Sequence, residues 1–377
     1  MKIVSVMTTT SRGGAEHAAA ELLDALAARG HDVVMVSDHP DGTRGDMDRQ
    51  TRVQLRPIAI GPKLSIRTAR GLALRLPLLI HRLRRTLAGE APYDVLLVHY
   101  KKEQLMGRQL PKRLQAALVW AEWGPVPVQM RKGIGRWIYR DAARSVKRIM
   151  AISQGTKDSV VAMGVDASKV EVVPNVMRGA ELGFSAEGRE RVRRELGIPD
   201  DAFVVGCISR FHPKKRNDVL VEAMKQLPER AHLILAGAGE TEEDLRQRAA
   251  PLNGRAHFVP TPKDDVNDYT SAFEIGVFCP SPAEGAPRAV ILPWMAGRPA
   301  VSTGAMGVAD MITGGVGEIL TPENDPDALA KLLSAYMDDP DRLAREGEAA
   351  KRHAFEVYDA PVVAERIEQI FKEAGAR

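Results

Sequence analysis

The chain has 377 residues, of which 44% are hydrophobic and 27% are charged, a composition that is ordinary for a globular protein with a full core. Its length favours two domains. The two cysteines, Cys207 and Cys279, are too few for a disulfide framework, and both lie in apolar, strand-like stretches, so we expect buried thiols and a reducing compartment.

The first residues show neither the apolar core nor the cleavage site of a signal peptide, and the most apolar segment, 71–80, is too short to span a membrane. We therefore expect a cytoplasmic protein. Residues 1–180 hold 29 Lys and Arg against 16 Asp and Glu, and the remainder holds 24 against 33. The basic first half favours an anionic partner; the alternative is a basic surface that only maintains solubility.

In chain order, apolar runs of strand length alternate with helical patterns. In the first half the predicted strands are 2–7, 32–37, 94–98, 117–120, 149–152 and 170–173, and the helical patterns are 14–28 and 67–87. In the second half the strands are 203–208, 232–236, 256–259, 275–279 and 299–302, and the helices include 217–227 and 241–250. The strands are apolar throughout rather than alternating, which is typical of parallel sheets buried on both faces.

This alternation predicts two doubly wound, Rossmann-like α/β domains, with a boundary near Val173, Pro174 and Asn175. Ligands of such sheets bind beyond the carboxyl ends of the strands, so we expect the site in the cleft between the domains. Three loops carry the candidate residues: Gly13 and Gly14 before the first helix, the basic run 209–216, and the loop 280–288 around Glu284.

Each loop has a chemical reason and a plainer alternative. Glycines at a helix start let a ligand approach the backbone, or they form only a tight turn. Arg210 and Lys215, directly after a buried strand, can hold a diphosphate, or they belong to a solvated basic loop. The Glu284 carboxylate can accept sugar hydroxyls, or it only faces a helix N-terminus.

Taken together, the loops occur in the order of a known family. The chain resembles the GT-B glycosyltransferases of the retaining family 4 type over nearly its whole length. The matching segments are Gly13 to Glu16, Ile152 to Lys157, Val172 to Asn175, Ser209 and Arg210 with Lys215, Leu235 to Gly239, Pro280 and Ser281 with Glu284 and Gly285, and Gly297 to Val301.

The resemblance implies an acceptor-binding domain at 1–175, a nucleotide-sugar-binding domain at 176–360, and a C-terminal helix at 361–377 that packs back on the first domain. It implies that Arg210 and Lys215 contact the donor diphosphate and that Glu284 lies against the donor sugar. The other donor-binding residues that it implies are Gly13, Gly14, Gly237, Thr261, Ala286, Pro287, Arg288 and Leu292.

Two positions depart from the family pattern. A second glutamate, which would hold the ribose, is expected eight residues after Glu284, where Leu292 stands. A histidine near the reacting sugar is replaced by Trp123, beside Glu122. We therefore name Glu122 as a catalytic candidate and Glu16, His99 and Trp123 as acceptor-side candidates; for His99 the alternative is a polar residue that only ends a strand.

The function that we expect is transfer of a hexose-type sugar from a nucleotide-diphosphate donor to an acceptor hydroxyl with retention of configuration. The donor is a co-substrate, UDP-type favoured over GDP-type, and we expect no cofactor, no metal site and no nucleic-acid partner. The acceptor is unknown, with an anionic or lipid-linked molecule as candidate. The alternatives are a non-catalytic sugar-nucleotide-binding or scaffold protein and a sugar-nucleotide epimerase.

The helical pattern at 67–87 carries Arg67, Arg70, Arg75, Arg82, Arg84 and Arg85 among leucines. A basic amphipathic helix can lie on an anionic membrane, so peripheral contact with the inner face of the membrane is one expectation. The alternative is a surface helix that packs on its own sheet.

Overall fold

The computed structural model describes residues 1–8, 13–38, 51–62, 64–65, 67–262, 265–282 and 284–376. Ser11 and Arg12, which flank the predicted glycine turn, lie outside these residues. The chain divides into two compact units: residues 1–177 with 360–377, and residues 178–359. No described helix is long and apolar enough to cross a membrane.

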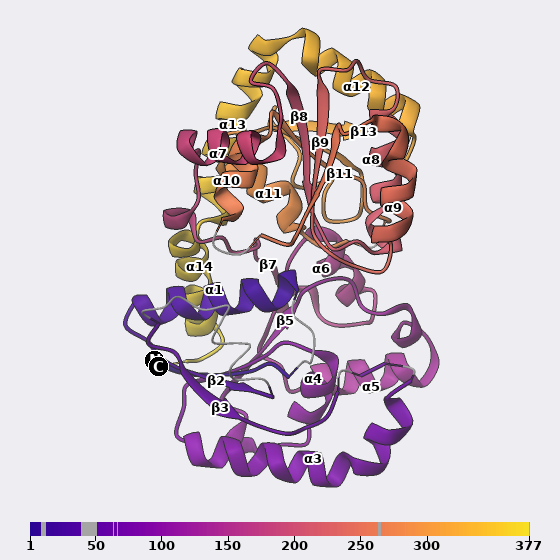
Figure 1. The fold of residues 1–377 in the computed structure, drawn as a ribbon. Coiled ribbons are helices and arrows are strands. Elements are labelled where there is room, and N and C mark those ends of the chain that lie inside the picture. Colours follow the sequence, from indigo (N-terminus) through magenta and orange to yellow (C-terminus); the bar gives the residue numbers. More distant parts are fainter. Residues whose placement is uncertain are drawn as a thin grey trace. The chain divides into compact units, whose positions relative to one another are not determined.

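The N-terminal unit is built on a parallel sheet with both faces covered (Figure 1). In spatial order its strands are β3 (Gln54–Pro57), β2 (Asp32–Ser37), β1 (Lys2–Val6), β4 (Val95–Val98), β5 (Ala117–Glu122), β6 (Arg148–Ala151) and β7 (Val170–Val172). Its helices are α1 (Gly14–Ala28), α3 (Ala69–Glu90), α4 (Lys101–Gly107), α5 (Gly133–Ala143), α6 (Gln154–Val161) and α14 (Ala360–Glu373).

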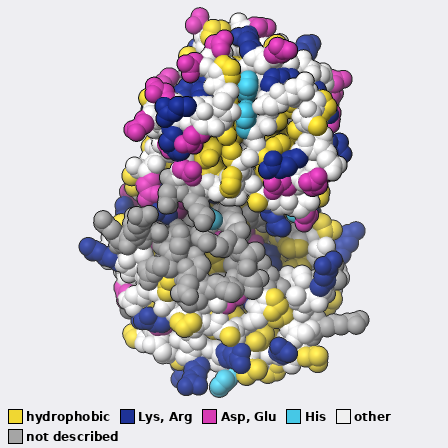
Figure 2. All heavy atoms as spheres, in the orientation of Figure 1, with side chains coloured by type: hydrophobic (Ala, Val, Ile, Leu, Met, Phe, Trp, Pro, Cys, Tyr) yellow, Lys and Arg dark blue, Asp and Glu magenta, His cyan; other side chains and the backbone are white. Residues whose placement is uncertain are grey.

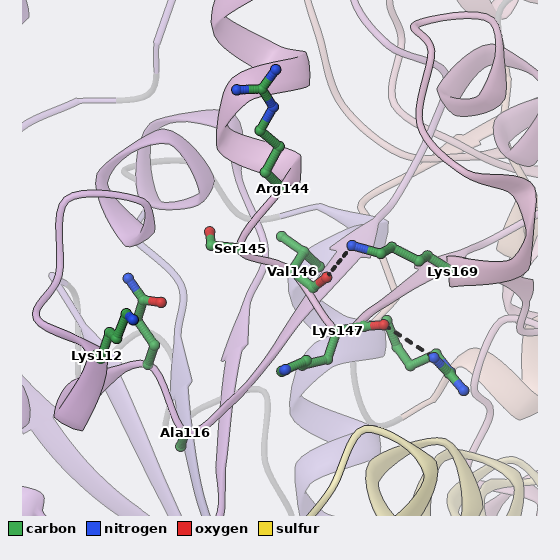
Figure 3. Close-up of a pocket in the computed structure, with 9 residues that line it drawn as sticks. Lys112, Ala116, Arg144, Ser145, Val146, Lys147 and Lys169 are labelled. Atoms are coloured by element: carbon green, nitrogen blue, oxygen red, sulfur yellow. Dashed lines mark hydrogen bonds between the residues drawn. The ribbon is translucent and has the colours of Figure 1, made fainter.

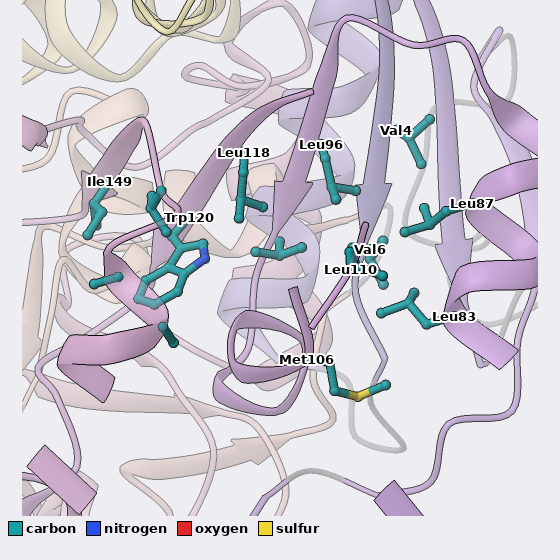
Figure 4. Close-up of a cluster of buried hydrophobic side chains, with 14 of the residues drawn as sticks. Val4, Val6, Leu83, Leu87, Leu96, Met106, Leu110, Leu118, Trp120 and Ile149 are labelled. Carbon is teal, nitrogen blue, oxygen red and sulfur yellow. The ribbon is translucent and has the colours of Figure 1, made fainter. Parts of the chain in front are cut away.

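Alternate strand residues point to two separate apolar cores, as the pleat requires. On one face, Val4, Val6 and Leu96 belong to a core that also holds side chains of α3, α4, α5 and α6. Figure 4 shows the part of this core where Leu83 and Leu87 of α3 and Met106 of α4 lie beside the strands. On the other face, Ile3, Met35 and Leu97 pack against α1 and α14. The C-terminal segment 360–377 therefore belongs to the N-terminal unit, where α14 lies against α1.

The C-terminal unit repeats the architecture with a second parallel sheet. Its strands, in spatial order, are β10 (Ala256–Val259), β9 (Ala231–Ala236), β8 (Phe203–Ile208), β11 (Ile275–Phe278), β12 (Ala300–Thr303) and β13 (Gly317–Leu320). Its helices are α7 (Ala186–Leu196), α8 (Asn217–Met224), α9 (Glu242–Ala249), α10 (Val266–Ala272), α11 (Arg288–Met295), α12 (Pro326–Asp338) and α13 (Pro340–Tyr358). The helix α8 packs against α9 and α12, and α11 packs against α13.

Both units are doubly wound, as the alternating pattern predicts. The predicted strands all appear, with ends that differ by at most two residues, and two edge strands, β3 and β13, have no counterpart in the prediction. In each sheet the chain reverses its direction of travel once, between β1 and β4 in the first sheet and between β8 and β11 in the second. These two switch points fix where a ligand can sit.

Candidate active site

The switch point of the C-terminal sheet brings the two predicted donor loops together. The basic loop follows β8 and the Glu284 loop follows β11, and these two strands are hydrogen-bonded neighbours. A backbone bond of 2.8 Å from the Ser281 N–H to the Lys214 carbonyl oxygen ties one loop to the other. The carboxyl ends of the two strands therefore present a single surface with a basic and an acidic side.

The basic loop has a fixed local shape. Residues 213–215 form a short 3₁₀ turn, and His212 Nδ1 accepts a hydrogen bond of 3.1 Å from the Lys214 N–H at its start. Arg216 closes the turn in the left-handed region, with φ near 50°, and forms an ion pair with Asp218 at 3.1 Å. Lys215, at the end of the turn, reaches the Phe278 ring at the end of β11.

Lys215 meets the predicted sugar-binding carboxylate. Its Nζ lies 2.7 Å from Glu284 Oε1 and 5.1 Å from the centre of the Phe278 ring. About a quarter of the lysine side chain and a fifth of the glutamate side chain are exposed. The pair is thus half-buried but open to solvent, where a ligand can reach both charges.

Arg210 lies on the same loop in a different setting. Its side chain is exposed, and among the described residues its guanidinium has no hydrogen bond or ion pair. The next residue, Phe211, is fully buried and packs edge-on against Phe258 with 6.2 Å between the ring centres. The buried ring anchors the backbone of the loop at this point, while the neighbouring guanidinium remains in solvent.

Glycines allow the neighbouring loop to lie against this one. A Cβ on Gly237 would stand 2.0 Å from the Ser209 carbonyl oxygen, and one on Gly239 would stand 2.1 Å from that of Phe211. The Gly237 N–H donates to the Val259 carbonyl oxygen at 3.0 Å, which ties the loop after β9 to the end of β10. Thr261 follows β10 and is exposed. The loop after β9 therefore lies against the loop after β8 and against the end of β10.

The loop from Glu284 to Pro287 is held in place by contacts with Gly307. The Gly307 N–H donates to the Glu284 carbonyl oxygen at 3.1 Å, and a Cβ on Gly307 would stand 1.2 Å from the Gly285 oxygen. Ala286 and Pro287 are buried, and α11 begins at Arg288. Leu292 is buried on this helix with 7% of its surface exposed, and its side chain cannot accept a hydrogen bond from a ribose.

In the N-terminal unit, Glu122 ends β5 and is almost fully buried. One carboxylate oxygen forms an ion pair with Lys101 Nζ, and the other accepts a hydrogen bond of 2.8 Å from the Tyr139 hydroxyl. Burial lowers the pKa of Lys101, an effect that Glu122 opposes, and raises the pKa of Tyr139. Both oxygens of this predicted catalytic carboxylate are thus engaged within the unit.

His99 and Trp123 contact each other beyond β4 and β5. The Trp123 indole N–H donates to His99 Nδ1 at 3.1 Å, and the two rings are stacked. Because an indole can only donate, His99 is neutral and its proton lies on Nε2, which donates to Ser5 Oγ at 2.8 Å. Burial lowers the pKa of His99 to about 3. Both ring nitrogens of His99 therefore have hydrogen-bond partners. This is also what the alternative interpretation, a polar residue that only ends a strand, requires.

The glycine turn precedes α1. Gly13 is the N-cap of this helix and has an extended backbone, and Gly14 is exposed. Glu16, in the first turn, accepts a hydrogen bond from the Tyr100 hydroxyl, which links α1 to the segment that follows β4. The structure thus places Gly13, Gly14, Glu16 and His99 around the switch point of the first sheet.

The sequence reasoning missed three polar residues at this edge: Lys101, Tyr139 and Glu103. Glu103 is fully buried, accepts a hydrogen bond from Thr8 and lies 3.7 Å from Lys102. Among the residues that the structure describes, its other oxygen, Oε2, has no hydrogen-bond partner, and burial raises the pKa of its carboxyl group to about 7. The run Lys101-Lys102-Glu103 directly after an apolar strand was the available signal.

Comparisons with known proteins agree with this arrangement. Residues 13–176 match the model of the glycosyl transferase 4-like domain, and residues 202–339 match that of the glycosyl transferases group 1. The chain belongs to the GT-B glycosyltransferases of the family 4, group 1 type. Within the described residues, no three His, Cys, Asp or Glu side chains are grouped so as to hold a metal ion.

The relatives of this glycosyltransferase-family chain are distant. It is 27% identical to the D-inositol 3-phosphate glycosyltransferase of Streptomyces avermitilis, over 92% of this chain and 80% of the relative. It is 30% identical to the protein of the same name from Thermobispora bispora, over 55% of this chain but only 52% of the relative. The crystal structure of Anabaena HepE with UDP and glucose has a TM-score of 0.83, with 19% identity and 99% of each chain covered. This likeness confirms the predicted GT-B fold.

Proposed function

We propose that the chain transfers a hexose-type sugar from a nucleoside-diphosphate donor to an acceptor hydroxyl with retention of anomeric configuration. The observation that carries the proposal is the position of Lys215, Glu284 and Arg210 at the switch point of the C-terminal sheet. This is the place where an α/β sheet takes its ligand, and the loop offers cations for phosphates and a carboxylate for hydroxyls.

In this proposal the donor diphosphate lies against the basic loop. The Arg210 guanidinium has no partner among the described residues, so an anion can bind it without breaking an internal contact. Lys215 is held by Glu284, and a phosphate would share that ammonium group while the carboxylate turns to the sugar hydroxyls. UDP is the favoured nucleotide because HepE was crystallised with UDP and with UDP-glucose.

The reaction breaks the bond between the anomeric carbon and the phosphate oxygen and forms a bond from that carbon to the acceptor oxygen. Negative charge grows on the departing phosphate, where Arg210 and Lys215 stabilise it. The acceptor proton passes to the same phosphate oxygen, on the face from which the leaving group departs. Charge placed in advance against developing charge is usually the largest catalytic contribution.

The acceptor is proposed to lie at the edge of the N-terminal sheet that holds Glu16, His99, Glu122 and Trp123. Both oxygens of Glu122 and both ring nitrogens of His99 already have hydrogen-bond or ion-pair partners. In this proposal Glu122 and His99 therefore hold neighbouring side chains of the acceptor site in position and do not exchange protons with the acceptor. An anionic acceptor fits the basic balance of the first half, and the Streptomyces avermitilis and Thermobispora bispora relatives are named for inositol 3-phosphate.

The experiment begins with binding. Thermal shifts are measured with UDP, GDP and their sugars, because a ligand at 100 times its dissociation constant stabilises the folded state by about 2.7 kcal/mol. Turnover is then compared between the wild type and Arg210→Ala, with Arg345→Ala as the control, because Arg345 is an exposed arginine of α13 in the same unit.

We expect Arg210→Ala to reduce turnover by about 10²–10³ while Arg345→Ala retains it. The anomeric configuration of the product is read by NMR. Wild-type turnover in Arg210→Ala, or an inverted product, contradicts the proposal. Release of free nucleotide and a rearranged sugar without an acceptor would instead identify an epimerase.

A further inference from the structure

One helix of the N-terminal unit exposes large apolar side chains that its own core does not use. On α5, Ile134 is 71% exposed, Trp137 is 64% exposed and Ile138 is 38% exposed. In the turn just before the helix, Val128 is 69% exposed. Side chains three and four residues apart lie on one side of a helix, so Ile134, Trp137 and Ile138 form one apolar stripe.

The opposite side of α5 already satisfies the fold. Tyr139, Ala142 and Ala143 are buried in the core beneath the sheet, with Tyr139 fully buried. The exposed stripe therefore contributes nothing to that core, although it keeps a tryptophan and two isoleucines in water. A contiguous apolar surface with a polar rim is typical of a place that another surface covers.

The rim of this stripe is strongly basic. Between residues 128 and 148 the sequence carries seven basic residues and a single acidic one, Asp141. The Asp141 carboxylate is already in contact with two arginines, Arg144 at 3.3 Å and Arg108 at 3.5 Å. Lys132 and Lys147 have no ion pair among the described residues. Figure 2 shows Lys and Arg side chains beside hydrophobic ones on the surface of this unit.

A cationic hollow lies at the end of the same helix. It has a volume of about 590 Å³ and is lined by Lys112, Lys147, Lys169, Arg144 and Arg148 together with smaller residues, none of them acidic among the described lining (Figure 3). Its residues precede β5, β6 and β7 or, as Arg148 does, begin a strand, so the hollow lies at the amino-terminal edge of the sheet, away from Glu122 and Trp123.

The apolar stripe and the cationic hollow lie on the same side of α5, one after the other along the helix axis. Arg144 is seven residues after Trp137, two helical turns further along the same side, which corresponds to roughly 10 Å. An apolar stripe with an aromatic residue, continued by a hollow rich in ammonium and guanidinium groups, matches a lipid surface with anionic headgroups. The stripe would enter the boundary of the acyl chains, and the hollow would take a headgroup phosphate.

We propose that the exposed side of α5 docks on an anionic phospholipid membrane, with Trp137 as its interfacial anchor. Tryptophan is favoured at the boundary between water and lipid because it joins a large apolar ring to a polar N–H. The helix α3 also exposes leucines, Leu74 at 86%, Leu76 at 40% and Leu78 at 50%, but its sequence holds no Trp, Tyr or Phe to serve as an aromatic anchor. The proposal needs no donor or acceptor and stands apart from the proposed reaction.

The test uses the full chain and vesicles of phosphatidylcholine with phosphatidylglycerol, against vesicles of phosphatidylcholine alone. The wild type should sediment with the anionic vesicles at low salt and be released at high salt. Trp137→Ser should weaken binding at least about tenfold. Lys132→Ala with Lys147→Ala should weaken it about 25-fold, since each basic residue near an anionic surface contributes roughly a factor of five.

Two controls keep the outcome clear. Val362→Ser removes an apolar side chain that is 44% exposed on α14, on the other face of the sheet, and should leave binding unchanged. Trp137→Phe should still bind, but it should lose the blue shift of tryptophan emission on vesicle addition. Trp120 and Trp294 are buried, and Trp123 is held against His99 beyond the carboxyl end of β5, at the other edge of the sheet. Failure of the wild type to bind overturns the proposal, as does full binding by Trp137→Ser or loss of binding only on Leu74→Ser.

Discussion

The Nζ of Lys215 lies 2.7 Å from Glu284 Oε1, although 69 residues separate them in the chain. Each residue follows a different strand, and the two strands are adjacent only because the sheet reverses its winding between them. The predicted phosphate-binding cation and the predicted sugar-binding carboxylate therefore neutralise one another when no donor is bound. This contact makes the two roles measurable separately.

Glu284→Gln should separate nucleotide binding from sugar transfer. The neutral amide leaves the Lys215 charge uncompensated, so UDP alone should bind about two- to fivefold more tightly, within the range of a partly exposed ion pair. Turnover should fall, because the amide is a weaker acceptor for sugar hydroxyls. Calorimetric titration with UDP and a donor assay check both, and Lys215→Met serves as the opposite case, with weakened UDP binding. If Glu284→Gln binds the donor more tightly and also keeps its turnover, the assigned role of Glu284 in holding the sugar is contradicted.

Gly307→Ala should displace the loop that carries Glu284. The added Cβ would stand 1.2 Å from the Gly285 carbonyl oxygen, so the backbone from Glu284 to Pro287 must move. We expect a loss of about 1–3 kcal/mol in the free energy of unfolding, as for overpacked cores, together with weaker donor binding. Urea unfolding and calorimetric titration measure the two effects.

The matched control is Gly89→Ala. A Cβ at Gly89, near the end of α3, meets no heavy atom within 4 Å. This substitution should stabilise the helix by about 0.5–1 kcal/mol and leave donor binding unchanged. If Gly307→Ala instead behaves like Gly89→Ala, the loop is not held in the way described.

The architecture could be predicted because buried parallel strands are apolar along their whole length, as in the run Phe203–Ile208. The strands β3 and β13 were not predicted because they are short, largely half-exposed and interrupted by polar residues, as in Gln54–Pro57, whereas the edge strands β7 and β10 follow recognisable apolar runs. The candidate site loops could be named from the sequence because their residues follow recognisable strands. The partners of Glu122 could not be found in this way, because Lys101 and Tyr139 come from two separate helices and meet only after packing.

Glu122→Gln should act on stability before it acts on chemistry. Only 3% of the Glu122 side chain and 15% of the Lys101 side chain are exposed, so the amide leaves a buried ammonium group without its counter-charge. We expect a loss of about 3–5 kcal/mol in the free energy of unfolding, whereas Tyr139→Phe should lose about 1 kcal/mol. Urea unfolding followed by tryptophan fluorescence measures both.

Replacing the pair as a whole gives the control. Lys101→Met with Glu122→Leu removes both buried charges and should recover most of the lost stability. If Glu122→Gln alone unfolds like the wild type yet loses turnover with the true acceptor, Glu122 takes part in the reaction itself.

Two buried groups of the N-terminal unit should give opposite pH dependences of stability. His99 has a folded pKa of about 3, below its ordinary 6.5, so the unfolded state binds more protons between these values and stability falls as pH falls through that window. Glu103 has a folded pKa of about 7, above its ordinary 4.5, so the folded state binds more protons and stability falls as pH rises from 4.5 to 7.

Between pH 4.5 and 6.5 the two contributions oppose each other, and single substitutions should reveal each one. His99→Gln can still accept from Trp123 and donate to Ser5, but it does not titrate, so its stability should decline more steeply than that of the wild type as pH rises. Glu103→Gln should show the reverse. Each slope should differ from that of the wild type by up to about 1.4 kcal/mol per pH unit, since one proton is involved. Urea unfolding across this window tests the pair, because titrating groups elsewhere cancel in the difference from the wild type; parallel curves for all three proteins would show that neither group titrates as described.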